Sequence, residues 1–166
     1  MKKYKAISNR RNFRLTEDNN LLGELVYIKW SSLNADIKLI DNNENKFKTK
    51  GIWNQKIELF QNDKKLLELK MGWKGIKIQT QFENHITNYL LKNISFFSNK
   101  FTLVDSDKTE LVQINSDFQW KKLRYDYDIT TTAEFDKLEN DKMLLFAIIY
   151  GINYRNTSMA AAGGAT

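Results

Sequence analysis

The segment that most restricts the fold lies near the C-terminus, where ten nearly unbroken apolar residues run from Met143 to Ile152. A surface helix is apolar along one stripe only, whereas these side chains point in every direction around a helical axis. Ten residues of helix span roughly 15 Å, about half of a bilayer's hydrocarbon core. A membrane-spanning helix is therefore disfavoured, and we expect the protein itself to surround this segment.

The chain before this segment alternates apolar and polar residues with a period of two, from residue 13 to 129. This period predicts strands that bury one face. In KLLELKMGW (65–73), for example, Leu67, Leu69 and Met71 share one face with Trp73. Clusters of Asn and Asp between such segments are typical of turns, so we expect successive antiparallel hairpins.

Some eleven or twelve strands would then need a common partner for their apolar faces. A sheet closed around the C-terminal helix meets this need, and about eleven or twelve strands give a lumen of roughly the 10 Å that a helix requires. The sequence predicts a mainly β fold, a closed antiparallel barrel built from hairpins that encloses one hydrophobic C-terminal α-helix. The alternative is a two-sheet sandwich with the helix packed across one open end.

The chain of 166 residues is expected to form one domain over residues 1–156, with the helix at about 137–154. Asp136 is a candidate N-cap. Gly151 would let the helix approach the wall closely, and the polar residues from Asn153 to Asn156 would mark where it leaves the barrel. The small residues 157–166 are expected to form a flexible tail.

Large aromatic residues recur at intervals of 23, 20, 24 and 23 residues, each just after the returning strand of a hairpin. The inferred buried faces would hold the aromatic residues, with Trp73 beside Leu67 and Leu69. Exposed stacking platforms are therefore not expected, which disfavours nucleic acid as a partner. The recurring residues are Trp30, Trp53, Trp73, Phe97 and Trp120.

Three segments near the C-terminus carry a family resemblance: FTLVDSDKTELVQI, QWKKLRYDYDI and DKMLLFAIIYGI. Their order after a run of hairpins resembles the tubby C-terminal-like superfamily, which includes LURP-one-related and phospholipid scramblase-like proteins. The resemblance covers residues 5–154 and rests on order and pattern. It implies a barrel around a hydrophobic C-terminal helix, and a binding module rather than an enzyme.

The same resemblance implies anionic lipid as a ligand, because tubby domains bind phosphoinositide headgroups through Lys and Arg on the outer barrel surface. Scramblase-like members associate with membranes and calcium. The phosphoinositide-binding residues do not match this sequence position by position, so none is carried over. DSDK (105–108) followed by Glu110 lacks the Gly and the ligand spacing of an EF-hand-type calcium loop.

Basic residues form the candidate binding site of this chain, whose formal net charge is +6. A positive surface favours anionic partners. We expect a non-catalytic binding module that associates weakly with an anionic phospholipid surface or headgroup; the alternative is a protein-interaction or scaffold domain with no small ligand. The candidate residues are Lys46, Lys48 and Lys50, on one face of a strand, and Arg10, Arg11 and Arg14, near the N-terminus.

Catalytic and metal chemistry has little support in the sequence. The chain has no cysteine, and its lone His85 has no nucleophile or orienting carboxylate placed beside it. Asp126 and Asp128 share one strand face with Lys122 and Arg124, which is typical of an outward charged face. We therefore expect no enzyme, no cofactor and no metal. MKKYKAISNRRNF lacks the apolar run of a signal peptide, so we expect a cytoplasmic protein, or one held peripherally at a membrane.

Overall fold

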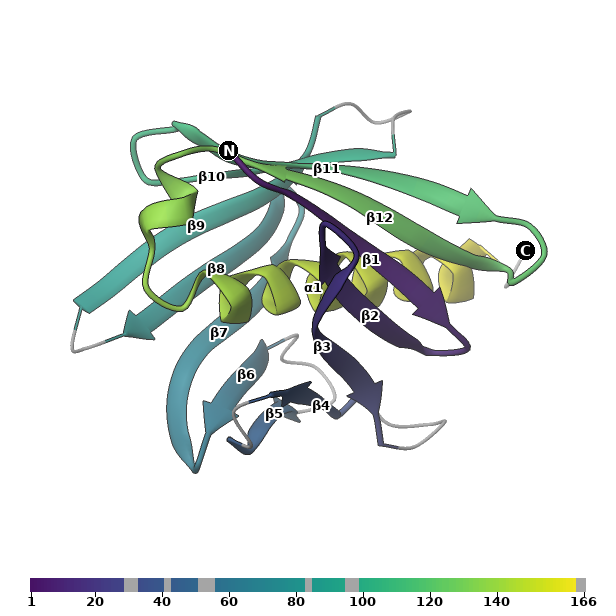
Figure 1. Cartoon of the computed structure of the whole chain (residues 1–166), viewed down its shortest axis with the longest axis horizontal. Coiled ribbons are helices and arrows are strands. Elements are labelled where there is room, and N and C mark those ends of the chain that lie inside the picture. The colour runs from purple at the N-terminus through teal and green to yellow at the C-terminus, as the bar shows by residue number, and fades with distance from the viewer. Residues whose placement is uncertain (29–32, 41–42, 51–55, 83–84, 95–98, 164–166) are drawn as a thin grey trace.

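The computed structural model describes residues 1–28, 33–40, 43–50, 56–82, 85–94 and 99–163. Within these residues, each strand pairs antiparallel with its neighbours in the chain, and β1 closes the barrel by pairing with β12 (Figure 1). The closed barrel confirms the predicted architecture and rules out the sandwich. The strands are β1 (Lys3–Asn9), β2 (Asn12–Glu17), β3 (Asn20–Tyr27), β4 (Ala35–Leu39), β5 (Asn45–Lys50), β6 (Lys56–Gln61), β7 (Lys64–Gly72), β8 (Gly75–Phe82), β9 (His85–Asn93), β10 (Lys100–Val104), β11 (Glu110–Gln119) and β12 (Arg124–Thr131).

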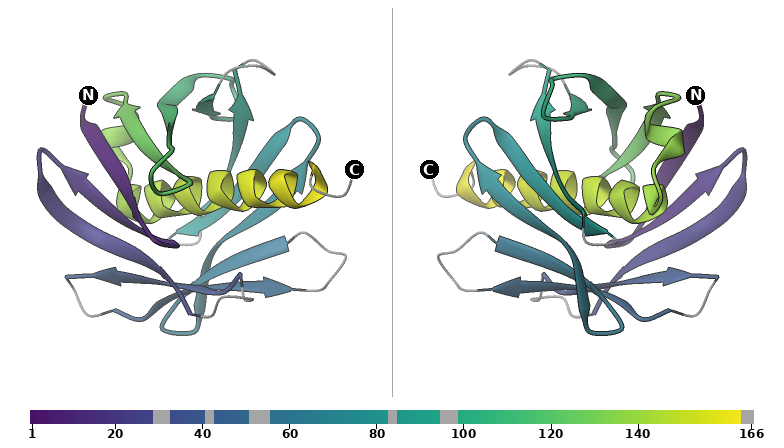
Figure 2. Two further views of the ribbon diagram at one scale, coloured as in Figure 1. Left: turned by 90° about the vertical axis from the view of Figure 1, so that its right-hand side faces the viewer. Right: turned by 90° about the vertical axis from the view of Figure 1, so that its left-hand side faces the viewer.

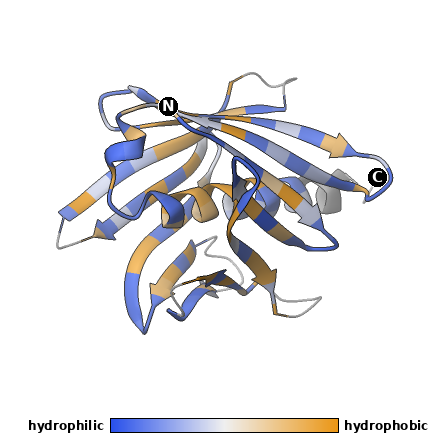
Figure 3. Cartoon of the chain, in the orientation of Figure 1, coloured by the Kyte–Doolittle hydropathy of each residue, from blue (hydrophilic) through white to orange (hydrophobic). Residues whose placement is uncertain are grey.

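In the described part of the chain one α-helix, α1 (Asp141–Gly163), runs through the barrel, and a short 3₁₀ helix, η1 (Phe135–Lys137), precedes it (Figure 2). Every residue from Met143 to Ile152 is buried, as the apolar segment predicted. The strands alternate apolar and polar residues along their length, and their apolar side chains join those of α1 in one core (Figure 3). Each large apolar side chain buried in this way contributes about 1.5–3 kcal/mol.

Gly151 brings the helix close to the wall of the barrel at β8. A methyl group added at this position would lie 3.1 Å from the Ile76 Cδ1 atom of β8, which is tighter than ordinary contact. One residue earlier, Tyr150 stacks on Phe47 with ring centroids 4.3 Å apart and donates a hydrogen bond to the Leu33 carbonyl. Residues 153–156 are partly exposed and residues 157 and 158 are exposed, so the helix leaves the core where the sequence predicted.

The helix bounds differ from the prediction at both ends. Asp136 is no N-cap of α1, because it lies in η1, where its carboxylate accepts hydrogen bonds from the Thr131 hydroxyl and pairs with the Met1 amine at 2.8 Å. Asn140, with φ +57°, separates η1 from the start of α1 at Asp141. At the other end α1 continues to Gly163, so residues 157–163 are helical rather than a flexible tail; their alanines are strong helix formers.

Among the described residues, no helix combines the length and the apolar character needed to cross a bilayer.

Candidate anion-binding surface

The structure places the predicted basic residues in two separate groups. Lys46, Lys48 and Lys50 lie on the outward side of β5, opposite to the fully buried Phe47. The arginines belong to the β1–β2 hairpin, with Arg10 and Arg11 in its turn and Arg14 on β2. Because β3 and β4 separate β2 from β5 in the barrel, the two groups do not form one site.

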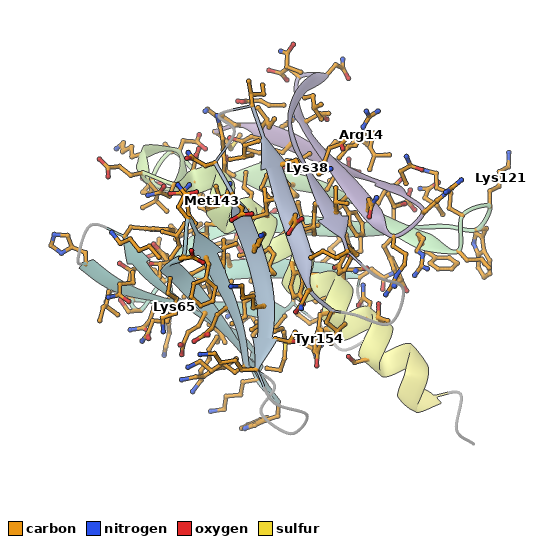
Figure 4. The ribbon with its side chains drawn as sticks, turned by 90° about the horizontal axis from the view of Figure 1, so that it is seen from below. Arg14, Lys38, Lys65, Lys121, Met143 and Tyr154 are labelled. Carbon is orange, nitrogen blue, oxygen red and sulfur yellow. The ribbon has the colours of Figure 1, made fainter. Side chains whose placement is uncertain are left out.

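Two of the three arginines contact neighbouring side chains. The Arg14 Nε atom lies 2.7 Å from a carboxylate oxygen of Glu24 on β3. The Arg11 guanidinium lies over the Tyr27 ring, 5.7 Å from its centroid. Glu24 in turn lies opposite Lys38 of β4, so charges of both signs follow one another across these strands (Figure 4). Glu24 offsets one of the three arginine charges, and Arg11 keeps its charge above a neutral ring.

The lysines of β5 belong to a larger set that the register of the sheet brings together. Lys50 lies directly opposite Lys56, Lys56 opposite Lys70, and Lys70 opposite Lys77, one residue from each of β5, β6, β7 and β8. We call these four residues the lysine row. Like charges directly opposite one another destabilise a sheet unless they are compensated.

Two glutamates in the adjacent row supply the compensation. Glu58 and Glu68 lie opposite one another on β6 and β7. Their side chains are only 3% and 6% exposed, because lysine side chains cover them. The Lys50 Nζ atom lies 3.0 Å from a carboxylate oxygen of Glu58. Three lysines contact the carboxylate oxygens of Glu68, with Nζ–O distances of 2.9 Å for Lys56, 2.9 Å for Lys70 and 3.1 Å for Lys65.

These contacts set the protonation of the glutamates. Burial alone would raise the pKa of the Glu68 carboxyl, but hydrogen bonds from Lys56, Lys70 and Lys65 outweigh burial and lower that pKa to about 2. The pKa of Glu58 is also lowered, because hydrogen bonds from Lys50 and Lys56 outweigh its burial. Both groups are therefore carboxylates at neutral pH, and their hydrogen bonds raise the pKa of Lys56 above its usual value.

The lysines outnumber the two carboxylates. Strands β5 to β8 carry eight lysines and two glutamates, a net charge of +6. Lys77 is exposed and makes no ion pair within the described part of the chain, and Lys48 lies over the Phe60 ring with its Nζ atom 4.9 Å from the centroid. We call the outer surface of β5–β8 the basic face. Its surplus charge can attract a surface or ligand that carries several negative charges.

Sequence reasoning found only part of the basic face. It identified Lys46, Lys48 and Lys50 because they alternate within one strand, but it missed Lys56, Lys65, Lys70 and Lys77. The alternation did show that Lys70 and Lys77 point outward. Only the register shows that these residues lie beside the lysines of β5, and register depends on pairings between different strands.

Both tryptophans that the structure describes contradict the prediction of buried aromatics. Trp73 is 87% exposed and Trp120 is 79% exposed. Each lies in a turn beyond the last paired residue of its hairpin, where the period of two no longer decides which way a side chain points. The argument against nucleic acid from buried aromatics therefore fails. Trp30, Trp53 and Phe97 lie outside the described residues.

The RYDYD segment behaves largely as predicted. Tyr127 is fully buried and Asp128 pairs with Lys5 of β1 at 3.7 Å. Asp126 accepts hydrogen bonds from the backbone N–H and the hydroxyl of Ser8. The two carboxylates thus link β12 to β1.

A cavity of about 170 Å³ lies between β8, β9 and the chain just before α1. Its lining includes His85, Glu139 and Thr87, and it is mainly apolar. No hydrogen bond within the described residues joins His85 to the Glu139 carboxylate or the Thr87 hydroxyl. The described residues also contain no cluster of acidic and histidine side chains arranged to hold a metal ion.

A second, larger hollow of about 610 Å³ follows β4 and β5. It is lined by charges of both signs, including Lys38 and Lys46 on one hand and Asp36 and Glu44 on the other. Lys46 pairs with Glu44 there, and this contact lowers the pKa of the carboxyl. Lys46 is therefore partly neutralised, unlike the exposed end of the lysine row at Lys77.

Comparison with known proteins adds a structural relative. The fold is similar to the crystal structure of a protein from Arabidopsis thaliana, with a TM-score of 0.63 over 93% of this chain and 91% of that one. The two sequences are 11% identical, so the likeness concerns the fold alone. No family model and no curated protein matches this sequence.

Proposed function

We propose that the protein is a non-catalytic binding module that associates with an anionic phospholipid surface through the basic face, and that its fold is that of the tubby C-terminal-like superfamily. The observation that carries the proposal is the lysine row, which gathers one outward lysine from each of four consecutive strands. Each lysine held near an anionic membrane contributes about 1 kcal/mol.

The glutamates beneath the row explain how the protein tolerates such a surface before a membrane is present. Glu58 and Glu68 offset part of the repulsion among lysines, and they lie below the lysine ends rather than beside them. An approaching bilayer would therefore meet ammonium groups first. Binding of this kind is weak, reversible and sensitive to salt, which fits a peripheral protein at the cytoplasmic side of a membrane.

Vesicle sedimentation tests the proposal. Wild-type protein should sediment with vesicles of phosphatidylcholine and phosphatidylserine, not with phosphatidylcholine alone, and binding should weaken as salt is added. The double variant Lys70→Gln/Lys77→Gln should bind about thirtyfold more weakly, because it removes about 2 kcal/mol of attraction.

The matched control is Lys3→Gln/Lys121→Gln, which removes the same charge from exposed positions on β1 and in the β11–β12 turn. Its affinity should stay within about threefold of wild type, since these lysines lie away from the basic face. Equal, negligible sedimentation of the wild type with neutral and anionic vesicles would remove the proposal. A protein partner captured independently of salt would favour the protein-interaction alternative instead.

A further inference from the structure

Trp73 is a large apolar side chain exposed at the tip of the β7–β8 hairpin. Gly72 and Gly75 pair across the hairpin, so Trp73 and Lys74 alone form the tip. The ring is 87% exposed, and within the described contacts only the Lys74 Nζ atom, 4.8 Å from its centroid, lies over it. Such exposure leaves most of the ring in water, although burial of a side chain of this size is strongly favourable.

The tip continues the basic face. Lys70 and Lys77, the last two members of the lysine row, lie opposite one another just behind the two glycines. On the neighbouring strand, Ile94 follows the end of β9 and is 52% exposed. An aromatic ring next to basic residues suits the interface of an anionic membrane, where lysines meet headgroups and tryptophan lies between headgroups and hydrocarbon.

The other exposed tryptophan has different surroundings. Trp120 packs edge-on against Phe118, with ring centroids 4.9 Å apart, and Phe118 packs in turn against Tyr125. Behind it Asp117 lies opposite Asp126, where the β7–β8 hairpin has Lys70 opposite Lys77. Its turn also lies far from the basic face, with Lys121 and Lys65 on opposite sides of the molecule (Figure 4).

We propose that Trp73 is a membrane anchor, which inserts into the interfacial layer of an anionic bilayer when the lysine row lies on the headgroups. This inference rests on the proposed function and adds a defined point of insertion to it. The lysines draw the basic face to the membrane, and the ring then leaves water at a fixed place on the barrel. The protein would therefore bind with the β7–β8 tip directed into the bilayer.

Affinity for vesicles of phosphatidylcholine and phosphatidylserine provides the first test. Trp73→Ala should bind about tenfold more weakly than wild type, whereas the matched variant Trp120→Ala should stay within about twofold. Both side chains are mostly exposed, so both variants should keep the circular dichroism spectrum and thermal midpoint of the wild type. Equal affinities of Trp73→Ala and wild type would overturn the anchor.

Tryptophan fluorescence provides a second test that does not depend on affinity. Bromine-labelled lipids should quench the wild type and Trp120→Phe, and most of this quenching should disappear in Trp73→Phe. If quenching persists in Trp73→Phe, the anchor is wrong. In that case the proposed function still stands if the Lys70→Gln/Lys77→Gln variant loses vesicle binding. Both the proposed function and the anchor fail if wild-type protein does not bind anionic vesicles.

Single-stranded oligonucleotides test whether Trp73 stacks on a nucleic-acid base instead of inserting into a membrane. We expect them to leave Trp73 fluorescence unchanged at physiological salt. Quenching by an oligonucleotide, together with no vesicle binding, would overturn both proposals and assign the tip and the lysine row to nucleic acid.

Discussion

Two hairpins of this barrel end in the same dipeptide, Trp-Lys, but their strands differ in charge. Trp73-Lys74 closes β7 and β8, within the four strands whose net charge is +6. Trp120-Lys121 closes β11 and β12, which together with β1 carry three basic and four acidic residues, a net charge of −1. The same exposed residue can therefore serve different roles, because the charges of the strands behind it determine which partner it can bind.

The two tips also differ in their backbones. Gly75 ends the β7–β8 tip with φ +144°, a conformation that residues with a side chain rarely adopt. In the β11–β12 tip, the Gln119 carbonyl accepts a hydrogen bond from the Lys122 N–H, and Leu123 follows with φ +51°. Glycine is the usual residue at such a left-handed position of a hairpin. One tip therefore has the residue its geometry favours, and the other does not.

The largest expected effect comes from Gly75→Ala. A Cβ atom there would lie 2.4 Å from the Leu91 carbonyl oxygen, and the φ angle would be strained in addition. We expect the free energy of unfolding in urea to fall by about 2–4 kcal/mol. Gly72→Ala is the matched control, because its nearest contact would be 3.2 Å and its φ is not positive. Equal losses for both variants would contradict the special role of Gly75.

Removing a carboxylate should change stability more on the basic face than on the surface of β1 and β12. Glu68→Gln should lower the free energy of unfolding at pH 7 by about 1–2 kcal/mol, because Lys70 loses its ion pair and Lys56 and Lys65 keep only Glu58. Asp128→Asn on the other face should cost less than about 0.5 kcal/mol, since that pair is exposed. The same Glu68→Gln variant should bind anionic vesicles about fivefold more tightly, because it removes a negative charge from the basic face.

The pH dependence of this effect has a defined sign. The pKa of Glu68 is about 2 in the folded protein, below its ordinary value of 4.5, so the unfolded chain takes up the proton first as pH falls. The stabilisation is present in full above pH 4.5 and is lost between 4.5 and 2. The difference in stability between wild type and Glu68→Gln should therefore shrink across this range. A difference that stays constant down to pH 2 would mean that the ion pairs do not stabilise the fold.

The sequence predicted the barrel because two local patterns required each other. The apolar segment from Met143 to Ile152 needed a wall on every side, and the alternating strands needed something to enclose. Both patterns depend on neighbours within a few residues, so one sequence displays them. The Gly151 contact with Ile76 follows from the same reasoning, since a helix that fills a lumen must pack closely against its wall.

The basic face and the tryptophan tips could not be derived in this way. Lys50 and Lys77 belong to one row only because three strand pairings align them. Each pairing depends on the length of a turn and on bulges such as the one between Leu59 and Phe60. Alternation also fails at a turn, which is why the pattern predicts a buried Trp73 although this side chain is exposed.

The smallest expected change in stability concerns Leu123, in the β11–β12 tip. Leu123→Gly removes a left-handed strain of about 1 kcal/mol, while the greater freedom of glycine in the unfolded chain offsets part of the gain. Little burial is lost, because Leu123 is 69% exposed. We expect a gain of about 0.5 kcal/mol in the free energy of unfolding, and no change in vesicle affinity.

Leu123→Asn separates backbone strain from side-chain contacts at this tip, because asparagine tolerates the left-handed conformation with less freedom in the unfolded chain. Both variants should be at least as stable as wild type if strain dominates. A loss of more than about 1 kcal/mol in both would show that the leucine side chain stabilises the hairpin through its contacts. In that case the β11–β12 tip would be held by side-chain packing and the β7–β8 tip by its glycine backbone, which would make the difference between the two tips larger than their φ angles alone suggest.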